Sequence, residues 1–208
     1  QKIVLKQQDE VETETKTVED SEKKADLKRA NDLFNRKKFS EALTLYRKFV
    51  KLKPKKHEIK IYVAHCLLGM KQYAEAIAAY RTCLKLLTGD NGSMKRRESL
   101  AAVYAGIAEA YLSQNQLAEA MTYFKQSIEV NPGDHILTYN VAEILFYSGK
   151  IDDAIRYYRM TIQNNPDFPN AYKRLGYSYL NRGEIKNAVK YLKKYLEMSP
   201  DAPDAPEI

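Results

Sequence analysis

Small and large residues recur along the chain at fixed spacings, and this regularity predicts a repeated pair of helices. One series contains alanine at spacings of 34, 44, 34 and 34 residues: Ala42, Ala76, Ala120, Ala154 and Ala188. Another series lies four positions further along and holds a large side chain: Tyr46, Tyr80, Phe124, Tyr158 and Leu192. Between these positions the apolar residues follow the period of a helix and not the alternation of a strand. We therefore expect an all-α chain of about five similar repeats.

Turns and prolines separate the predicted helices. In the last repeat, residues 181–184 interrupt two apolar stripes, and Pro132, Pro166 and Pro200 close successive repeats 34 residues apart. Proline suits these places because it cannot continue a helix. The longer spacing of 44 places ten additional residues, 89–98, between the second and third repeats. We expect the last five residues of this insert to lengthen the helix that follows it.

The last repeat has the sequence NAYKRLGYSYLNRGEIKNAVKYLKKYLEMSP and resembles a tetratricopeptide repeat (TPR). The repeats of that family are 34-residue helix–turn–helix units with small residues at the contacts between helices, an aromatic residue on the second helix and a closing proline. The resemblance implies an all-α fold, a right-handed α-α superhelix or TPR solenoid of antiparallel helix pairs. It extends over a domain of residues 23–200, and its repeats are expected at residues 23–54, 55–88, 99–132, 133–166 and 167–200.

The two ends of the chain do not fit the repeat. Residues 1–22 form a leader, which we expect to be partly disordered or to end an upstream domain, because residues 1–6 alternate as in a strand. Residues 17–20 resemble the start of a helix. Residues 201–208 form a tail too short for the helix that usually caps a solenoid. We therefore expect part of the last helix, with Ile185, Leu192 and Tyr195, to be exposed, either because the chain is a piece of a longer one or because this repeat forms a homo-oligomer.

The net charge of +7 is concentrated in one part of the chain. Residues 25–88 carry 15 basic and 5 acidic side chains, whereas residues 99–166 carry 4 basic and 7 acidic ones. A basic surface of this kind attracts nucleic acid or an anionic membrane. The chain contains no stretch of about 20 apolar residues that would span a bilayer. Its compartment stays open, and both a cytoplasmic and an exported, periplasmic protein fit the sequence.

Sequence motifs for catalysis or cofactor binding are absent. The eight glycines form no GxGxxG or phosphate-binding loop, and the three histidines form no HExxH motif. Cys66 and Cys83 lack the spacing of metal ligands, so we expect them to be buried as small apolar residues. We therefore expect no enzymatic activity, no cofactor and no metal site.

In the tetratricopeptide repeat family, ligands bind the concave face that the first helices of the repeats line. The resemblance places the following residues on that face: Asn31, Phe34, Asn35, His65, Glu109, Tyr139, Asn140, Glu143, Phe146, Tyr147, Lys173, Arg174, Tyr177 and Asn181. Aromatic anchors and scattered polar groups suit an extended peptide or an amphipathic helix. The sequence thus predicts a scaffold that binds another protein or a peptide in this groove. Packing of the same aromatic residues between neighbouring repeats is the alternative interpretation, and electrostatic binding to nucleic acid or membrane is the alternative function.

Some family members hold a C-terminal carboxylate with a clamp of lysine, asparagine and arginine side chains. In the first three repeats Asn31 matches that pattern, and in the last three Asn140 and Arg174 match it, but other clamp positions do not. The clamp is incomplete in both frames. We therefore expect this chain not to bind acidic chaperone tails.

Overall fold

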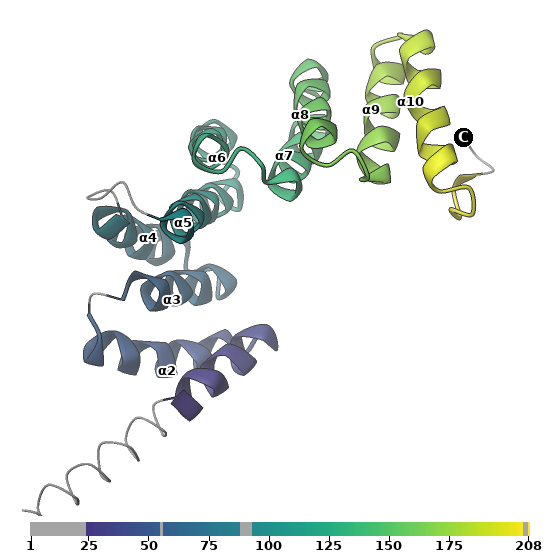
Figure 1. The fold of residues 1–208 in the computed structure, drawn as a ribbon. Helices are drawn as coiled ribbons and strands as arrows, with labels where there is room; N and C mark the ends of the chain where they lie inside the picture. The colour runs from purple at the N-terminus through teal and green to yellow at the C-terminus, as the bar shows by residue number, and fades with distance from the viewer. Residues whose placement is uncertain (1–23, 55, 88–92, 206–207) are drawn as a thin grey trace, which may run out of the picture. The chain divides into compact units, whose positions relative to one another are not determined.

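The computed structural model describes residues 24–54, 56–87, 93–205 and 208, and in these residues it contains ten helices and no strand (Figure 1). The strand expected at residues 1–6 and the helix start expected at residues 17–20 lie outside the described residues. The first helix covers residues 24–35, and the others are α2 (Phe39–Leu52), α3 (His57–Gly69), α4 (Tyr73–Leu87), α5 (Met94–Leu112), α6 (Leu117–Val130), α7 (His135–Tyr147), α8 (Ile151–Asn164), α9 (Pro169–Asn181) and α10 (Ile185–Met198).

The chain divides into two compact units, and the division falls between Tyr123 and Phe124 of α6. In the N-terminal unit, which ends at Tyr123, α3 packs against α2, α4 and α5, and α4 packs against α5. In the C-terminal unit, which begins at Phe124, α7 packs against α8, α8 against α9, and α9 against α10. Within each unit these helices therefore pack against their neighbours in sequence, as expected for a solenoid of stacked helix pairs. Among the described residues, no helix has both the length and the apolar character that crossing a bilayer requires.

The alanine series lies in the interior of the fold, where all five of its members are fully buried. Four positions further on, the rings of Tyr46, Tyr80 and Tyr158 are fully buried as well. A side chain reduced to one methyl group lets two helix backbones approach, and the large residue one turn later fills the space beside it. Cys66 and Cys83 are buried free thiols, as expected.

The turn between the two helices of each repeat contains one residue in the left-handed backbone region. These residues follow the spacing of the alanine series, and their φ angles lie between +59° and +74°: Lys37, Lys71, Asn115, Gly149 and Gly183. Glycine adopts this conformation without a steric cost, whereas a residue with a Cβ atom is strained in it. The sharp reversal of the chain is therefore a regular feature of the repeat, including the repeats in which glycine is missing.

The insert contributes to the end of one helix and the start of the next. Its residues Met94 to Glu98 belong to α5, which confirms the expected lengthening of that helix. The Arg96 side chain donates hydrogen bonds from Nε to the Leu87 carbonyl at 3.0 Å and from Nη2 to the Leu86 carbonyl at 2.8 Å. These carbonyls end α4 and have no partner within their own helix. A positive charge from the insert thus caps the C-terminus of α4.

Part of the apolar face of the last helix is exposed, as expected. Ile185 of α10 is 59% exposed, whereas Leu192 and Tyr195 on the same helix are buried. The tail accounts for part of this cover, because Asp204 accepts a hydrogen bond from the Tyr195 hydroxyl at 2.7 Å. The same carboxylate pairs with Lys173 Nζ of α9 at 2.9 Å. A homo-oligomer formed through this repeat stays a prediction.

Candidate functional site

The polar groups of the first helices are held by tyrosines of the second helices. The hydroxyl of Tyr46 donates to Asn31 Oδ1 at 2.7 Å, and that of Tyr158 donates to Glu143 Oε1. The hydroxyl of Tyr80 lies 2.5 Å from His65 Nδ1. Each of these bonds joins residues 15 positions apart, so the repeat itself generates the pattern. Asn31, His65 and Glu143, which the sequence predicts as groove residues, are thereby fixed within the fold.

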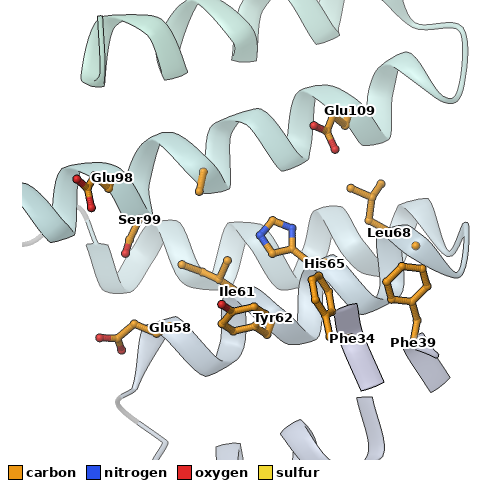
Figure 2. A pocket seen from close by; sticks show the side chains of 12 residues that line it. Phe34, Phe39, Glu58, Ile61, Tyr62, His65, Leu68, Glu98, Ser99 and Glu109 are labelled. Atoms are coloured by element: carbon orange, nitrogen blue, oxygen red, sulfur yellow. The ribbon is translucent and has the colours of Figure 1, made fainter. Parts of the chain in front are cut away.

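A pocket of about 650 Å³ lies in the N-terminal unit between the first helix, α3 and α5 (Figure 2). It brings together three predicted groove residues, Phe34, His65 and Glu109, from three successive first helices. Its other lining residues are Phe39, Glu58, Ile61, Tyr62, Leu68, Gly69, Glu98, Ser99 and Ala102. We call this space the N-terminal pocket.

The floor of the N-terminal pocket is aromatic and apolar. The ring of Tyr62 stacks on that of Tyr46 with centroids 5.2 Å apart, and meets Phe34 edge to face at 5.4 Å. Ile61 and Leu68 lie on the same helix as Tyr62 and line the pocket, and Figure 2 shows the Tyr62 ring beside that of Phe34. Such a floor buries an apolar side chain of a ligand at about 25 cal/mol per Å² of apolar surface removed from water.

Charged groups of one sign border the N-terminal pocket. Glu98 and Glu109 lie on α5 and Glu58 on α3 (Figure 2). His65 does not balance these carboxylates, because burial lowers its pKa to about 4 and keeps the imidazole neutral at pH 7. Removal from water raises the pKa of Glu109 above its ordinary value, as for a carboxylate without a counter-ion. The pocket is therefore an apolar space with an acidic border.

A second cluster of predicted groove residues forms in the C-terminal unit around Arg174 of α9. The Arg174 guanidinium donates to Glu143 Oε2 and to the Tyr147 hydroxyl, both at 2.5 Å. It also lies over the rings of Phe146 and Tyr147, at 5.6 and 5.2 Å from their centroids. Tyr139 packs nearby, with its ring 5.9 Å from that of Tyr158. Because Arg174 is paired with Glu143, it is not free to hold a ligand carboxylate in the way the family's clamp requires.

The other predicted groove residues are not brought into either cluster. Lys173 of α9 is paired with Asp204 of the tail, and Asn181 bonds to the Tyr177 carbonyl of its own helix at 3.4 Å. Asn35 and Asn140 are exposed. The structure therefore places every predicted groove residue on the first helix of its repeat, but gathers only some of them, around two separate centres.

Sequence reasoning missed the two glutamates at the helix starts, Glu58 and Glu98. The family pattern counts positions from the regular start of each repeat, and Glu98 lies before that start, in the insert. One signal was available, because Glu98, Ala102 and Glu109 are spaced by four and seven residues and so share one face of a helix. Within the described stretches, no group of three or more histidine, cysteine or acidic side chains is arranged to hold a metal ion.

Two family models described as tetratricopeptide repeat match the chain, at residues 34–167 and at residues 139–203. The first of these covers more than half of its length. The chain belongs to the tetratricopeptide repeat family. The ten helices correspond to about five repeats, and the family is one of protein-interaction modules. No curated protein matches this TPR chain in sequence.

Solved structures of other TPR proteins resemble it. A crystal structure of MamA matches with a TM-score of 0.66 and 22% identity, over 86% of this chain and 92% of that one. MamA from Desulfovibrio magneticus RS-1 matches with a TM-score of 0.64 and 15% identity, over 87% and 97%. YrrB, described as a TPR protein with an unusual peptide-binding site, matches with a TM-score of 0.62 and 19% identity, over 93% and 95%. These likenesses show the fold, a helical repeat solenoid.

Proposed function

We propose that this TPR chain is a protein-interaction module that binds a peptide, or one helix of a partner protein, on the face formed by the first helices of its repeats. The observation that carries the proposal is the N-terminal pocket, where three successive first helices surround an apolar space. A volume of about 650 Å³ accommodates several side chains of an extended peptide. A lining of this kind supports the binding of a ligand and not catalysis.

The polar surroundings of the pocket suit the recognition of a chain and not of a small metabolite. Charged groups stand at the border while the floor is apolar, which is the arrangement in which apolar anchors supply affinity and polar groups fix register. The tyrosine hydroxyls hold Asn31 and His65 in place, so the face is organised before a ligand arrives. A preorganised face loses little entropy on binding.

The experiment fills the pocket without removing any buried group. Ala102 is exposed and lines the pocket, so Ala102→Trp places an indole in the space that a ligand would occupy. Ala78→Trp is the matched control, because Ala78 is also exposed but lies on α4 and does not line the pocket. Peptides selected from a random displayed library on the wild-type chain are then measured with all three proteins by fluorescence polarisation.

We expect Ala102→Trp to weaken binding of the selected peptides at least about tenfold, and Ala78→Trp to leave it at the wild-type level. Circular dichroism checks that both variants keep the helical content and the unfolding temperature of the wild type. Selection of no peptide, or equal binding by the two tryptophan variants, contradicts the proposal.

A further inference from the structure

The two carboxylates on α5 indicate which peptides the N-terminal pocket prefers. We propose that it selects a segment in which two lysine or arginine residues stand about five positions apart, with an apolar residue between them. The inference rests on the proposed function and names the chemistry of the peptide. Its basis is the position and the pairing of Glu98 and Glu109, each of which lines the pocket.

Glu109 occupies the position at which three other repeats carry a polar side chain that is hydrogen-bonded to a tyrosine hydroxyl. The residue 15 positions after Asn31, His65 and Glu143 is tyrosine in each case, and its hydroxyl bonds to that polar group. The residue 15 positions after Glu109 is Phe124, which has no hydroxyl. Among the residues that the structure describes, none forms a hydrogen bond or an ion pair with the Glu109 carboxylate. This position of the repeat is thus left with an unused acceptor that faces the pocket.

Glu98 marks the other end of the pocket, and it too is paired with no other residue of the described stretches. Glu58 stands near it on α3 (Figure 2). Two groups approach Glu58: His57 Nδ1 at 3.8 Å, which is a cation only when protonated, and Lys95 Nζ at 3.9 Å, whose side chain is 77% exposed, so both pairs are weak. The acidic character of that end is therefore mostly uncompensated.

The spacing of the two carboxylates sets the spacing of the cations. Glu98 and Glu109 are eleven residues apart on one helix, which separates them by about 16 Å along its axis at about 1.5 Å per residue. An extended peptide rises about 3.3 Å per residue, so about five positions cover the same distance. Between the two ends lie Ile61, Tyr62 and Leu68, which offer contacts to an apolar side chain placed between the cations.

The charge of the pocket is opposite in sign to the charge of the surrounding sequence. This difference makes the preference for basic peptides specific. Residues 25–88 carry a large basic excess, yet the side chains lining the pocket include three glutamates and no lysine or arginine. A peptide with acidic groups at the same spacing would place like charges together, which disfavours binding. The selection is therefore for basic segments and against acidic ones.

The test uses three acetylated and amidated peptides that differ only at the two charged positions. The basic peptide is Gly-Lys-Ala-Ser-Leu-Ser-Lys-Gly, and the other two carry glutamine or glutamate in place of both lysines. Affinities are measured for the full chain by isothermal titration calorimetry at about 0.15 M salt. We expect the basic peptide to bind at least about tenfold more tightly than the glutamine peptide, and the glutamate peptide to bind most weakly.

Glutamine variants test the two carboxylates without changing side-chain size. Glu98→Gln and Glu109→Gln should each reduce the preference for lysine over glutamine about threefold or more, and the double variant should remove most of it. Glu75→Gln is the matched control, because Glu75 is an exposed glutamate of the same compact unit on α4, outside the pocket. It should retain the wild-type preference.

The possible results separate this inference from the proposed function. If the three peptides bind equally and Ala102→Trp abolishes the binding of all three, the pocket is a peptide site without charge selection and the inference is wrong. Tighter binding of the glutamate peptide also overturns it. If none of the three binds, the inference fails as well, and the library selection with Ala102→Trp then decides the proposed function independently.

Discussion

Tyrosine hydroxyl groups determine which polar side chains of this solenoid are available to bind a ligand. Tyr46, Tyr80 and Tyr158 are buried to the same extent, and each reaches a polar group 15 positions earlier in the chain. Burial without a hydrogen-bond partner would cost each hydroxyl about 1–3 kcal/mol, so the polar partner contributes to stability as well as to the surface. The predicted groove residues Asn31, His65 and Glu143 therefore have a structural role, which leaves less of their bonding capacity for a ligand.

His65 should make the stability of the N-terminal unit depend on pH. Its pKa falls from 6.5 to about 4 on folding because the imidazole is buried, so between these values the unfolded chain binds a proton that the folded chain excludes. Stability should therefore decrease as the pH is lowered from 6.5 towards 4, by on the order of 2–3 kcal/mol in all. Thermal unfolding of the wild type and of His65→Gln, followed by circular dichroism from pH 7 to pH 4.5, measures the effect.

Glutamine is the suitable replacement because its side-chain amide also bonds to a tyrosine hydroxyl and does not titrate. The unfolding temperature of the variant should decline less steeply than that of the wild type below pH 6.5. Parallel curves for the two proteins would show that His65 is not responsible for the acid sensitivity of the unit.

At the scale of the helix, helix ends are stabilised by residues that the repeat pattern of the sequence does not identify. The insert illustrates this, because its Arg96 donates hydrogen bonds to the last carbonyls of α4. Charge-assisted hydrogen bonds at a helix C-terminus satisfy carbonyls that otherwise face the interior or water. The insert therefore stabilises the junction between α4 and α5 in addition to lengthening α5.

Arg96→Ala should destabilise the chain by about 1 kcal/mol, because it removes two hydrogen bonds and a favourable interaction with the dipole of α4. Arg97→Ala is the control, since Arg97 is an exposed neighbour on the same helix. Urea unfolding curves of the two variants should differ, with a lower midpoint for Arg96→Ala alone. An unchanged midpoint in that variant would indicate that the two hydrogen bonds contribute nothing measurable.

The elements themselves could be predicted from the sequence, and the pairing of side chains could not. The alanine and tyrosine series define the helices and their contacts, since small residues must lie where backbones meet. The position of the groove residues on the first helices follows from the same register. Whether Arg174 points towards a ligand or towards Glu143 depends on side-chain geometry between neighbouring repeats, which no spacing encodes. Glu98 was missed because it lies in the insert, before the regular frame of its repeat begins, whereas Glu58 lies inside the frame of the second repeat.

At the scale of the whole molecule, the total charge and the charge of the pocket have opposite signs. The net charge of +7 would attract polyanions to any exposed basic surface, whereas the pocket is acidic. Arg47, Lys48 and Lys51 are exposed on one side of α2, and no ion pair joins them to other residues in the described part of the chain. These three cations do not line the pocket, so binding of polyanions and binding of basic peptides should be independent of each other.

Binding of nucleic acid by α2 should be weak and strongly dependent on salt. Contacts of these three cations with three phosphates release the counterions bound there. Affinity for duplex DNA should then fall about 40-fold between about 50 and 200 mM salt. Replacing Arg47, Lys48 and Lys51 together by glutamine should therefore remove most of the salt dependence, measured by fluorescence anisotropy with a labelled duplex. Glu109→Gln should leave DNA binding unchanged while it weakens binding of the basic peptide. Affinity that persists at 200 mM salt, or competition between DNA and the basic peptide, would instead make the basic surface a specific site and favour nucleic-acid binding as the main function.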